Sequence, residues 1–536
     1  MLSPIRKTQL FTLFFLGVLV FSGTIVLSNN SVSAISSNTS ITTDKLTPNE
    51  SFALESNPTP NGKMQPVTLK IITRHSTTIQ LYMETAFLAS QQATDNNIVD
   101  IQWTQPGAEY WPTVIPTYNP DIAWGGGPSL FDTIDMLGYL KPMNSTYMDS
   151  VMSRIPDDMA GSPMKRFDEN MDVIWAAAAI SSFGFTINKP WLDDKGLPYP
   201  THWENLTSFE FGGLLPAPTV AMGNSPGTTS NTKIYEIILQ RFGWEKGWET
   251  LSRMAANGRI YSGSVETQNA VEVGEVGVSM SIDFYGYTTA LRNPGTEYII
   301  PQNGSIINGD PIALCTTGTS IANASESFID WVLSPEGQQI WLHEDINRMP
   351  ILEDAFLLDK LNPINPSLGA RDDLYAFYNT TLQNLSIEFD DPLSLSYEYS
   401  LMFYFESVIT DAHEKLVDCW GAILDALSAG WITETEAEDF AGMMAAPVSW
   451  NDGANTFNES YAISINGQMG SSSSFRSNMQ STWTDAANDQ YDYVRSLIPT
   501  GPGAPPPPIP GFPAISLVIG VAAALGIGLY VRRRRE

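Results

Sequence analysis

The 536-residue chain contains few histidines and cysteines, the side chains that many catalytic and metal sites use. It has four histidines and two cysteines, and it contains no Cys-x-x-Cys pair, no His-Glu-x-x-His pair and no Gly-x-x-x-x-Gly-Lys phosphate loop. Cys315 and Cys419 are far apart in the sequence, so they indicate either one disulfide or two buried thiols. These absences favour a binding protein over an enzyme, and no cofactor is predicted.

Basic residues are also scarce. The chain has 28 Lys and Arg against 58 Asp and Glu, which gives a formal net charge of −30. A body of this charge repels nucleic acid and anionic lipid, so we exclude a nucleic-acid partner. Hydrophobic residues make up 43% of the chain and aromatic residues 11%, which is enough for sizeable folded cores.

The N-terminus has the pattern of an export signal. Arg6 and Lys7 precede an apolar run over residues 10–27, and small residues follow the run. This order predicts a secretory signal peptide over residues 1–34, and an uncleaved N-terminal anchor is the alternative.

The C-terminus has the pattern of a membrane anchor. Residues 496–513 are rich in proline and predict a semi-extended linker, and the uncharged apolar residues 514–531 are long enough to span a bilayer as a helix. Four arginines within residues 532–536 place that end in the cytoplasm. The sequence at 510–512 resembles the archaeal Pro-Gly-Phe sorting signal, which implies cleavage and lipid attachment as the alternative. Both alternatives predict a membrane-anchored protein whose body lies at the cell surface.

The body of the chain alternates strand and helix patterns. Residues 35–62 are polar and aperiodic and predict a flexible leader, and residues 63–495 form the folded body. Apolar spacing near three and four predicts that residues 360–495 are mainly helical, with a helix over 396–428. Helix caps of the Ser/Thr-x-x-Glu type are predicted at two places, Thr201 with Glu204 and Thr433 with Glu436.

The start of the body predicts an α/β fold. A β-branched strand over 67–73 is followed by a helix over 79–92 and a strand over 98–103, which implies a parallel sheet with a right-handed crossover. A short strand over 120–124 then runs into three glycines, and the next helix is expected near Ser129.

Several segments together resemble the extracellular solute-binding proteins of ABC importers, in the class that contains ferric-iron, thiamine and phosphate-ester binders. The resemblance covers residues 65–350 and rests on the motifs at 121–129, 194–206, 273–278 and 333–338. It implies a two-lobed, periplasmic-binding-protein-like (type II) fold, with two α/β lobes, a two-strand hinge and ligand held in the cleft. It also implies a monomer that delivers a small ligand to the membrane subunits of an importer.

Four stretches are candidates for the ligand site. Ligands of open α/β sheets lie beyond the carboxyl ends of the strands, where glycines, helix N-termini and polar side chains are available. The predicted ligand-binding residues are Arg74, His75, Ser76, Trp124, Gly126, Gly127, Ser225, Gly227, Thr228, Thr229, Asp283, Tyr285 and Asp310. Asp283, Tyr285 and Tyr287 are expected on the polar face of one strand, because apolar and polar residues alternate over 276–285.

The ligand remains open between three chemistries. A phosphorylated or otherwise anionic metabolite would use Arg74, the glycine amides and the hydroxyls of residues 225–229. Ferric iron would use His75, Asp283, Tyr285 and Tyr287, although the resemblance implies adjacent tyrosines and Gly286 separates them here. A thiamine- or polyamine-type cation would stack on Trp124 beside Asp283 and Asp310. A structural surface protein without a transported ligand is the remaining alternative.

Overall fold

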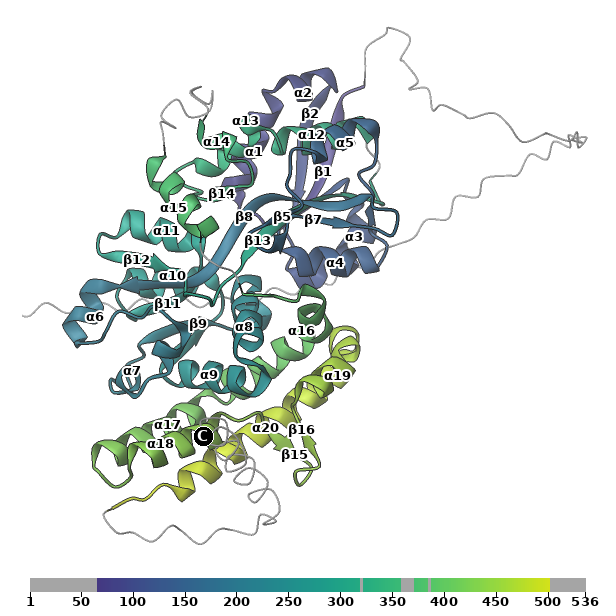
Figure 1. The fold of residues 1–536 in the computed structure, drawn as a ribbon. Coiled ribbons are helices and arrows are strands. Elements are labelled where there is room, and N and C mark those ends of the chain that lie inside the picture. Colours follow the sequence, from purple (N-terminus) through teal and green to yellow (C-terminus); the bar gives the residue numbers. More distant parts are fainter. Residues whose placement is uncertain (1–64, 319–321, 358–370, 384–386, 502–536) are drawn as a thin grey trace, which may run out of the picture. The chain divides into compact units, whose positions relative to one another are not determined.

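The computed structural model describes residues 65–318, 322–357, 371–383 and 387–501 (Figure 1). The predicted signal peptide, leader and C-terminal anchor lie outside these residues. Among the described residues, no helix combines the length and the apolar composition needed to cross a membrane.

The first lobe is built on the parallel sheet that the sequence predicts. β1 (Val67–Thr73) pairs in parallel with β2 (Ile98–Thr104) and with β3 (Ile122–Trp124), and α1 (Thr77–Leu88) connects β1 to β2. The helix begins two residues earlier than predicted, because the side chain of Ser76 caps it. β1 has the predicted bounds.

Two strands carry the chain between the lobes. β8 (Val173–Asn188) has 16 residues, and all but the last are buried, since both of its faces are covered. Its first half pairs with β13 (Ile307–Cys315), and its second half pairs with β11 (Val278–Ile282) and β12 (Thr296–Ile299). The middle of β8 and the start of β13, which we call the hinge, therefore belong to both lobes (Figure 1).

The second lobe repeats the α/β arrangement. β9 (Val220–Gly223) pairs in parallel with β10 (Gly258–Tyr261) and with β11. The segment between β9 and β10 forms two helices, α8 (Thr229–Phe242) and α9 (Trp244–Ala256). The order of the main sheet is β10-β9-β11-β8-β13-β3-β1-β2, so the predicted α/β class is confirmed.

The strand predicted over 276–285 is too long. β11 ends at Ile282, and the chain turns directly into α11 (Asp283–Arg292). The alternating serines of β11 do not form an exposed polar face either, because Ser279 and Ser281 are buried and their hydroxyls donate to backbone carbonyls. Alternation here reflects small residues that fit a strand covered on both faces.

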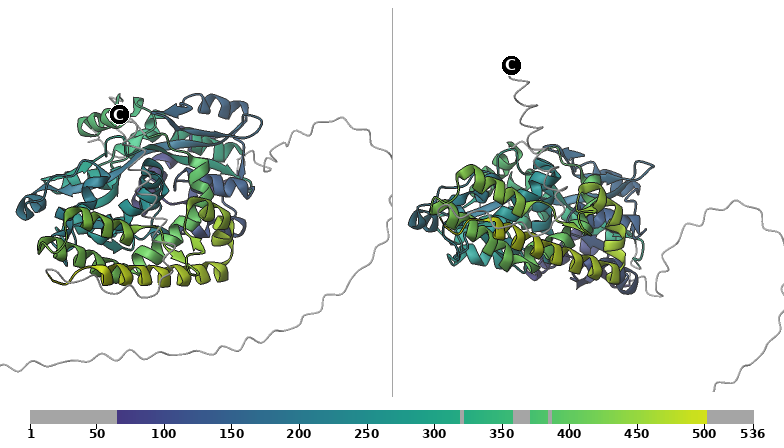
Figure 2. Two further views of the ribbon diagram at one scale, coloured as in Figure 1. Left: turned by 60° about the horizontal axis from the view of Figure 1, so that its bottom comes forward. Right: turned by 90° about the horizontal axis from the view of Figure 1, so that it is seen from below.

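The described residues after position 371 are mostly helical. α16 (Asp391–Phe405), α17 (His413–Ser428), α18 (Glu434–Ala445), α19 (Glu459–Ser471) and α20 (Ser473–Leu497), called here the C-terminal helices, lie against α8 and α9 (Figures 1 and 2). They share one continuous hydrophobic core with the second lobe, whose members include Trp248, Met254, Tyr404, Trp420 and Trp483. The C-terminal helices are therefore part of the second lobe and not a separate domain.

Of the two predicted helix caps, one is confirmed and one is wrong. Thr433 and Glu436 form the predicted reciprocal cap at the start of α18. The cap predicted from Thr201 and Glu204 is wrong, because the helical turn over Trp203–Thr207 is a 3-10 turn that starts after His202. The side chain that accepts the terminal amides is therefore that of Asn205. The helix predicted over 396–428 is divided by a π-helical turn at Glu406–Asp411.

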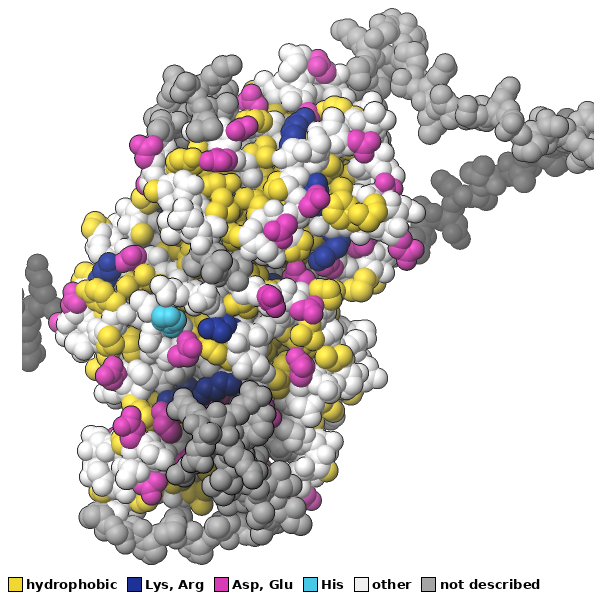
Figure 3. Space-filling model, viewed as in Figure 1, with side chains coloured by type: hydrophobic (Ala, Val, Ile, Leu, Met, Phe, Trp, Pro, Cys, Tyr) yellow, Lys and Arg dark blue, Asp and Glu magenta, His cyan; other side chains and the backbone are white. Residues whose placement is uncertain are grey.

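The two cysteines are free thiols. Cys315 lies in the core on one face of the first lobe, and Cys419 lies in the core that the second lobe shares with the C-terminal helices. On the face seen in Figure 3, acidic side chains are spread over the surface and do not gather in one patch.

Candidate binding pocket

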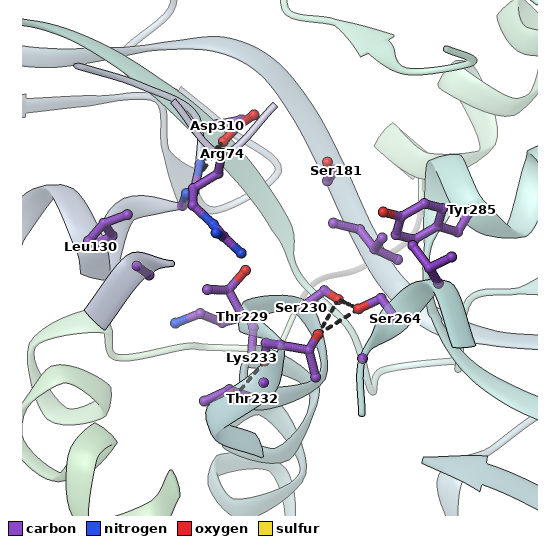
Figure 4. Close-up of a pocket in the computed structure, with 18 of the residues that line it drawn as sticks. Arg74, Leu130, Ser181, Thr229, Ser230, Thr232, Lys233, Ser264, Tyr285 and Asp310 are labelled. Atoms are coloured by element: carbon purple, nitrogen blue, oxygen red, sulfur yellow. Dashed lines mark hydrogen bonds between the residues drawn. The ribbon is translucent and has the colours of Figure 1, made fainter. Parts of the chain in front are cut away.

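A pocket of about 750 Å³ lies beside the hinge and is lined by both lobes and by α16 (Figure 4). On the first lobe it lies beyond the carboxyl ends of β1 and β3, where ligands of α/β sheets are generally held. On the second lobe it is bounded by the loops that begin α8 and α10 (Ser264–Glu272).

Most of the predicted site residues line this pocket. Those that do are Arg74, His75, Ser76, Gly126, Gly127, Ser225, Gly227, Thr228, Thr229, Tyr285 and Asp310. Three of the predicted residues, Trp124, Asp283 and Tyr287, are not among the lining residues. The structure thus brings together segments that are up to about 240 positions apart in the sequence.

Arg74 presents its guanidinium to the pocket. One nitrogen, Nη1, donates to the carbonyl oxygen of Pro106 at 2.9 Å, while Nε is buried and has no partner among the described residues. In Figure 4 the guanidinium points toward Thr229 on the opposite lobe. The side chain is therefore held in place at one nitrogen and has donors left for a ligand.

The N-terminus of α8 presents hydroxyl groups to the same space. Thr228 caps the helix, and its Oγ1 lies 2.5 Å from Ser264 Oγ and 3.2 Å from Ser230 Oγ. Ser230 and Ser264 are 2.6 Å apart, so the three hydroxyls form one cluster (Figure 4). Hydroxyl donors at the positive end of a 14-residue helix suit an anionic group.

The loop before α8 is shaped by a close approach of two backbones. A Cβ atom on Gly227 would clash with the carbonyl oxygen of Ser262, so only glycine fits at this position. The segment Gly223–Gly227 also has the Gly-x-Ser-x-Gly spacing of a hydrolase nucleophile. The hydroxyl of Ser225 is buried, and its side-chain partner is Thr232 at 2.8 Å, so this serine is not activated by a histidine.

Asp310 on β13 is the centre of a buried ionic group at the hinge, called here the hinge group. Its carboxylate lies 2.7 Å from Arg348 Nη1 and 3.6 Å from His75 Nε2, and it accepts hydrogen bonds from the amides of Gly126 at 2.9 Å and Gly127 at 3.4 Å. Burial raises the pKa of Asp310, but these partners outweigh it, Arg348 most of all, and the pKa lies below its usual range. The prediction that the two glycine amides are free for a ligand is therefore wrong.

His75 is enclosed and neutral. Its ring packs against Trp124 at 4.6 Å and Trp341 at 5.3 Å, and burial lowers its pKa to about 3 despite the neighbouring Asp310. Trp124 is itself fully buried in the core beneath His75. The prediction that Trp124 forms a wall of the pocket is wrong, because the strand that carries it is covered on both faces.

Arg348 is a site residue that the sequence did not indicate. Besides Asp310, it donates to Ser181 on β8 at 3.2 Å, and its guanidinium lies over the rings of Phe284 and Trp341. It therefore connects the hinge with both lobes. No local pattern marks this arginine, because the polar partners of its guanidinium, Asp310, Ser181 and His75, are all distant in the sequence.

The residues proposed for ferric iron do not share one face. α11 starts at Asp283, so Tyr285 and Tyr287 lie about 200° apart around the helix. Tyr285 faces the pocket, whereas Tyr287 packs against Tyr298 and Phe377 in the core of the first lobe. Sequence alternation predicted a shared face only because it assumed a strand.

Asp283 is also committed to the protein. Its carboxylate accepts from the amide of Ser182 at 2.7 Å and from the amide of Phe284 at 2.8 Å, and burial raises its pKa to about 7. Among the described residues, no group of three or more His, Cys, Asp and Glu side chains is arranged to hold a metal ion.

Lys233 and Glu398 form a third part of the pocket wall that the sequence did not indicate. The ammonium of Lys233 lies 2.6 Å from a carboxylate oxygen of Glu236, and it donates to Ser129 of the first lobe at 3.1 Å and to Ser394 of α16 at 3.4 Å. This lysine therefore joins both lobes and the C-terminal helices at the edge of the pocket.

Two α/β lobes that share hinge strands and enclose one polar pocket form the architecture expected of a two-lobed solute-binding protein. Residues 119–373 match the family described as bacterial extracellular solute-binding protein. The matched segment includes much of both lobes and ends before the C-terminal helices.

The curated relatives are similar over part of their length. The phosphoglycerate transport regulatory protein PgtC of Salmonella typhimurium is 25% identical over 280 residues, which cover 51% of this chain and 66% of the relative. An uncharacterized protein of Haemophilus influenzae is 24% identical over 214 residues, which cover 39% of this chain and 57% of that protein. The chain thus spans just under two thirds of the length of PgtC.

Solved structures with a similar fold include two binding proteins. The periplasmic binding protein AfuA of Actinobacillus pleuropneumoniae, with fructose-6-phosphate bound, has a TM-score of 0.45 and 14% identity, and covers 59% of this chain and 98% of its own. Iron-bound HitA of Pseudomonas aeruginosa has a TM-score of 0.45 and 16% identity, and covers 63% of this chain and 99% of its own.

Proposed function

We propose that the protein is a surface receptor that binds a small phosphorylated or otherwise anionic metabolite and delivers it to the membrane subunits of an ABC importer. The observation that carries the proposal is Arg74, whose guanidinium keeps donors without a partner in the described part of the chain and points across the pocket at the hydroxyls of α8. A guanidinium on one lobe and a helix N-terminus on the other hold an anion best when the lobes are together.

The proposed anion contacts are Arg74 on the first lobe and Thr228 and Thr229 on the second, together with the loop at Ser225, whose own hydroxyl is bonded to Thr232. His75, Asp310 and the two glycines before α4 (Pro128–Met136) have a positioning role, because they bond one another and hold the loop that carries Arg74. The body is proposed to be an extracellular monomer tethered to the membrane through its C-terminus.

Ferric iron and a flat cation would each need residues that already have other roles within the protein. Iron would need Tyr287 and Asp283, and both are held within the protein. A flat cation would need Trp124, which is buried, and Asp310, which Arg348 already neutralises. A structural role without a ligand remains as the second candidate, and it predicts no ligand at all.

A thermal-shift screen separates these candidates. We expect 3-phosphoglycerate or another phosphate ester at 100 times its dissociation constant to stabilise the protein by about 2.7 kcal/mol. Arg74→Ala should remove the shift, whereas Arg241→Ala, an exposed charge at the far end of α8, should keep it. A shift with ferric citrate, thiamine or spermidine and none with phosphate esters would refute the anion assignment. No shift with any of them would favour the structural role.

A further inference from the structure

The C-terminal helices contribute a wall to the pocket. Glu398, Tyr399 and Met402 of α16 line the same space as Arg74. α16 also contacts both α4 of the first lobe and α8 of the second. Since α16 begins at Asp391, this wall lies outside the segment that matches the solute-binding family, residues 119–373.

Glu398 is the polar group of this wall that has no hydrogen-bond partner among the described residues. Its side chain is half-buried and faces the pocket, and its carboxylate accepts no hydrogen bond from the described residues. The charged groups that act on it are Glu236 and Lys233 of α8, Asp391 of α16 and Asp132 of α4. Burial, followed by repulsion from Glu236, raises the pKa of Glu398 to about 8.

The cations near Glu398 are already in use. Lys233 is held by Glu236 at 2.6 Å, and Arg166, the nearest partner of Asp132, bonds that carboxylate at 2.7 Å. Burial also raises the pKa of Asp391, against the attraction of Lys233. Among the described residues, the acids in this part of the pocket therefore outnumber the cations, and each of the two cations is paired with another acid.

The proposed anion site and the α16 wall are connected along α8. Thr229 and Lys233 are four residues apart on α8, so they lie on one face of the helix and about 6 Å apart along its axis. Thr229 is opposite Arg74 (Figure 4), and Lys233 donates a hydrogen bond to Ser394 of α16 at 3.4 Å. Arg74 and Glu398 therefore line two parts of one pocket that are joined along this face of α8.

We propose that Glu398 is a specificity-determining residue that binds an ammonium group of the ligand, while Arg74 and the N-terminus of α8 hold its phosphate. The ligand class is a small phosphorylated amine, with its phosphate and its ammonium a few bonds apart. This inference rests on the proposed function, because it assumes the anion site at Arg74.

A matched pair of compounds tests the inference. O-phosphoserine and 3-phosphoglycerate differ only in carrying an ammonium or a hydroxyl group on the central carbon. Isothermal titration of the whole folded body should show that O-phosphoserine binds at least about tenfold more tightly than 3-phosphoglycerate, as expected for one charge-assisted hydrogen bond. Glu398→Gln should remove that preference and leave the affinity for 3-phosphoglycerate within about twofold, since it keeps the shape of the side chain.

Two further measurements make the test specific. Glu388→Gln, which changes an exposed acid on the same stretch of chain, should keep the full preference. At pH 7, Glu398 must lose its proton to pair with an ammonium, so binding of O-phosphoserine should release a proton and the measured heat should depend on the buffer. The Glu398→Gln variant should show no such release.

The outcomes separate this inference from the proposed function. Equal affinity of the wild type for both compounds, or a preference that survives in Glu398→Gln, would overturn the inference and leave the anion site intact. Failure of both compounds to bind, together with no thermal shift from any phosphate ester, would contradict the proposed function and the inference with it.

Discussion

The pocket wall contains two clusters of charged side chains that are built in opposite ways. In the hinge group, Asp310 is matched by Arg348 and by the amide of Gly126, and its pKa is lowered. On the α16 side, no cation in the described part of the chain pairs with Glu398, and burial together with repulsion from Glu236 raises its pKa to about 8. The charge of Asp310 is balanced by Arg348 within the protein. We propose that the charge of Glu398 is balanced by an ammonium group of the ligand.

The difference separates residues that hold the fold from residues that are available to a ligand. Satisfied buried networks fix one arrangement of the chain, whereas an unmatched titratable group in a pocket is a usual sign of a functional position. The two groups therefore predict stability changes of opposite sign when each is altered.

The largest effect is expected at the hinge. Arg348→Met leaves the carboxylate of Asp310 buried without its cation, which should lower the free energy of unfolding by about 3–5 kcal/mol, as measured by urea denaturation. The double change Arg348→Met with Asp310→Asn should recover part of the loss, since it removes the unpaired charge. Arg241→Met, at an exposed arginine, serves as the control and should change stability by less than about 0.5 kcal/mol. A loss of the same small size in Arg348→Met would mean that the hinge group does not hold the fold.

The next effect depends on pH. The pKa of His75 is about 3 in the folded protein and about 6.5 when unfolded, so the unfolded chain binds the proton first as the pH falls. Between pH 7 and pH 4.5 this histidine should reduce stability by about 2–3 kcal/mol. Urea denaturation over this range should show a shallower loss in His75→Gln than in the wild type. If stability falls equally with pH in the wild type and in His75→Gln, protonation of His75 does not destabilise the folded protein.

A smaller effect of the opposite sign is expected at Glu398. Because its folded pKa is raised above its unfolded value, its ionisation destabilises the protein progressively as the pH rises from about 4.5 through about 8. Glu398→Gln should therefore gain about 1–3 kcal/mol at pH 8.5, and the gain should fade toward pH 5. A variant that is less stable than the wild type at pH 8.5 would show that Glu398 is satisfied, like Asp310.

Local patterns predicted much of the fold and one half of the pocket. Short runs of consecutive residues predict the strand at Val67–Thr73, the glycine turn after β3 and the capped start of α8. These features identified Arg74 and Thr228 as candidate site residues. Their chemistry depends on local geometry, such as a strand end or a helix N-terminus, which sequence spacing reports well.

The residues that the sequence did not indicate depend on distant partners. Arg348 joins Asp310 and Ser181, and Glu398 reaches the pocket only because α16 packs across both lobes. No spacing in the sequence encodes such contacts. The error at Asp283 has a different cause, since an alternating strand pattern continues unchanged into the first turn of a helix.

The central claim is that an anion bridges Arg74 and the N-terminus of α8, and isothermal titration tests it most directly. We predict that 3-phosphoglycerate binds the wild type with one-to-one stoichiometry, and that Arg74→Ala weakens binding at least about tenfold by removing a charge-assisted contact. Arg241→Ala, on the same helix as the proposed anion contacts, should bind like the wild type. Unchanged affinity in Arg74→Ala, or equal loss in both variants, would contradict the account.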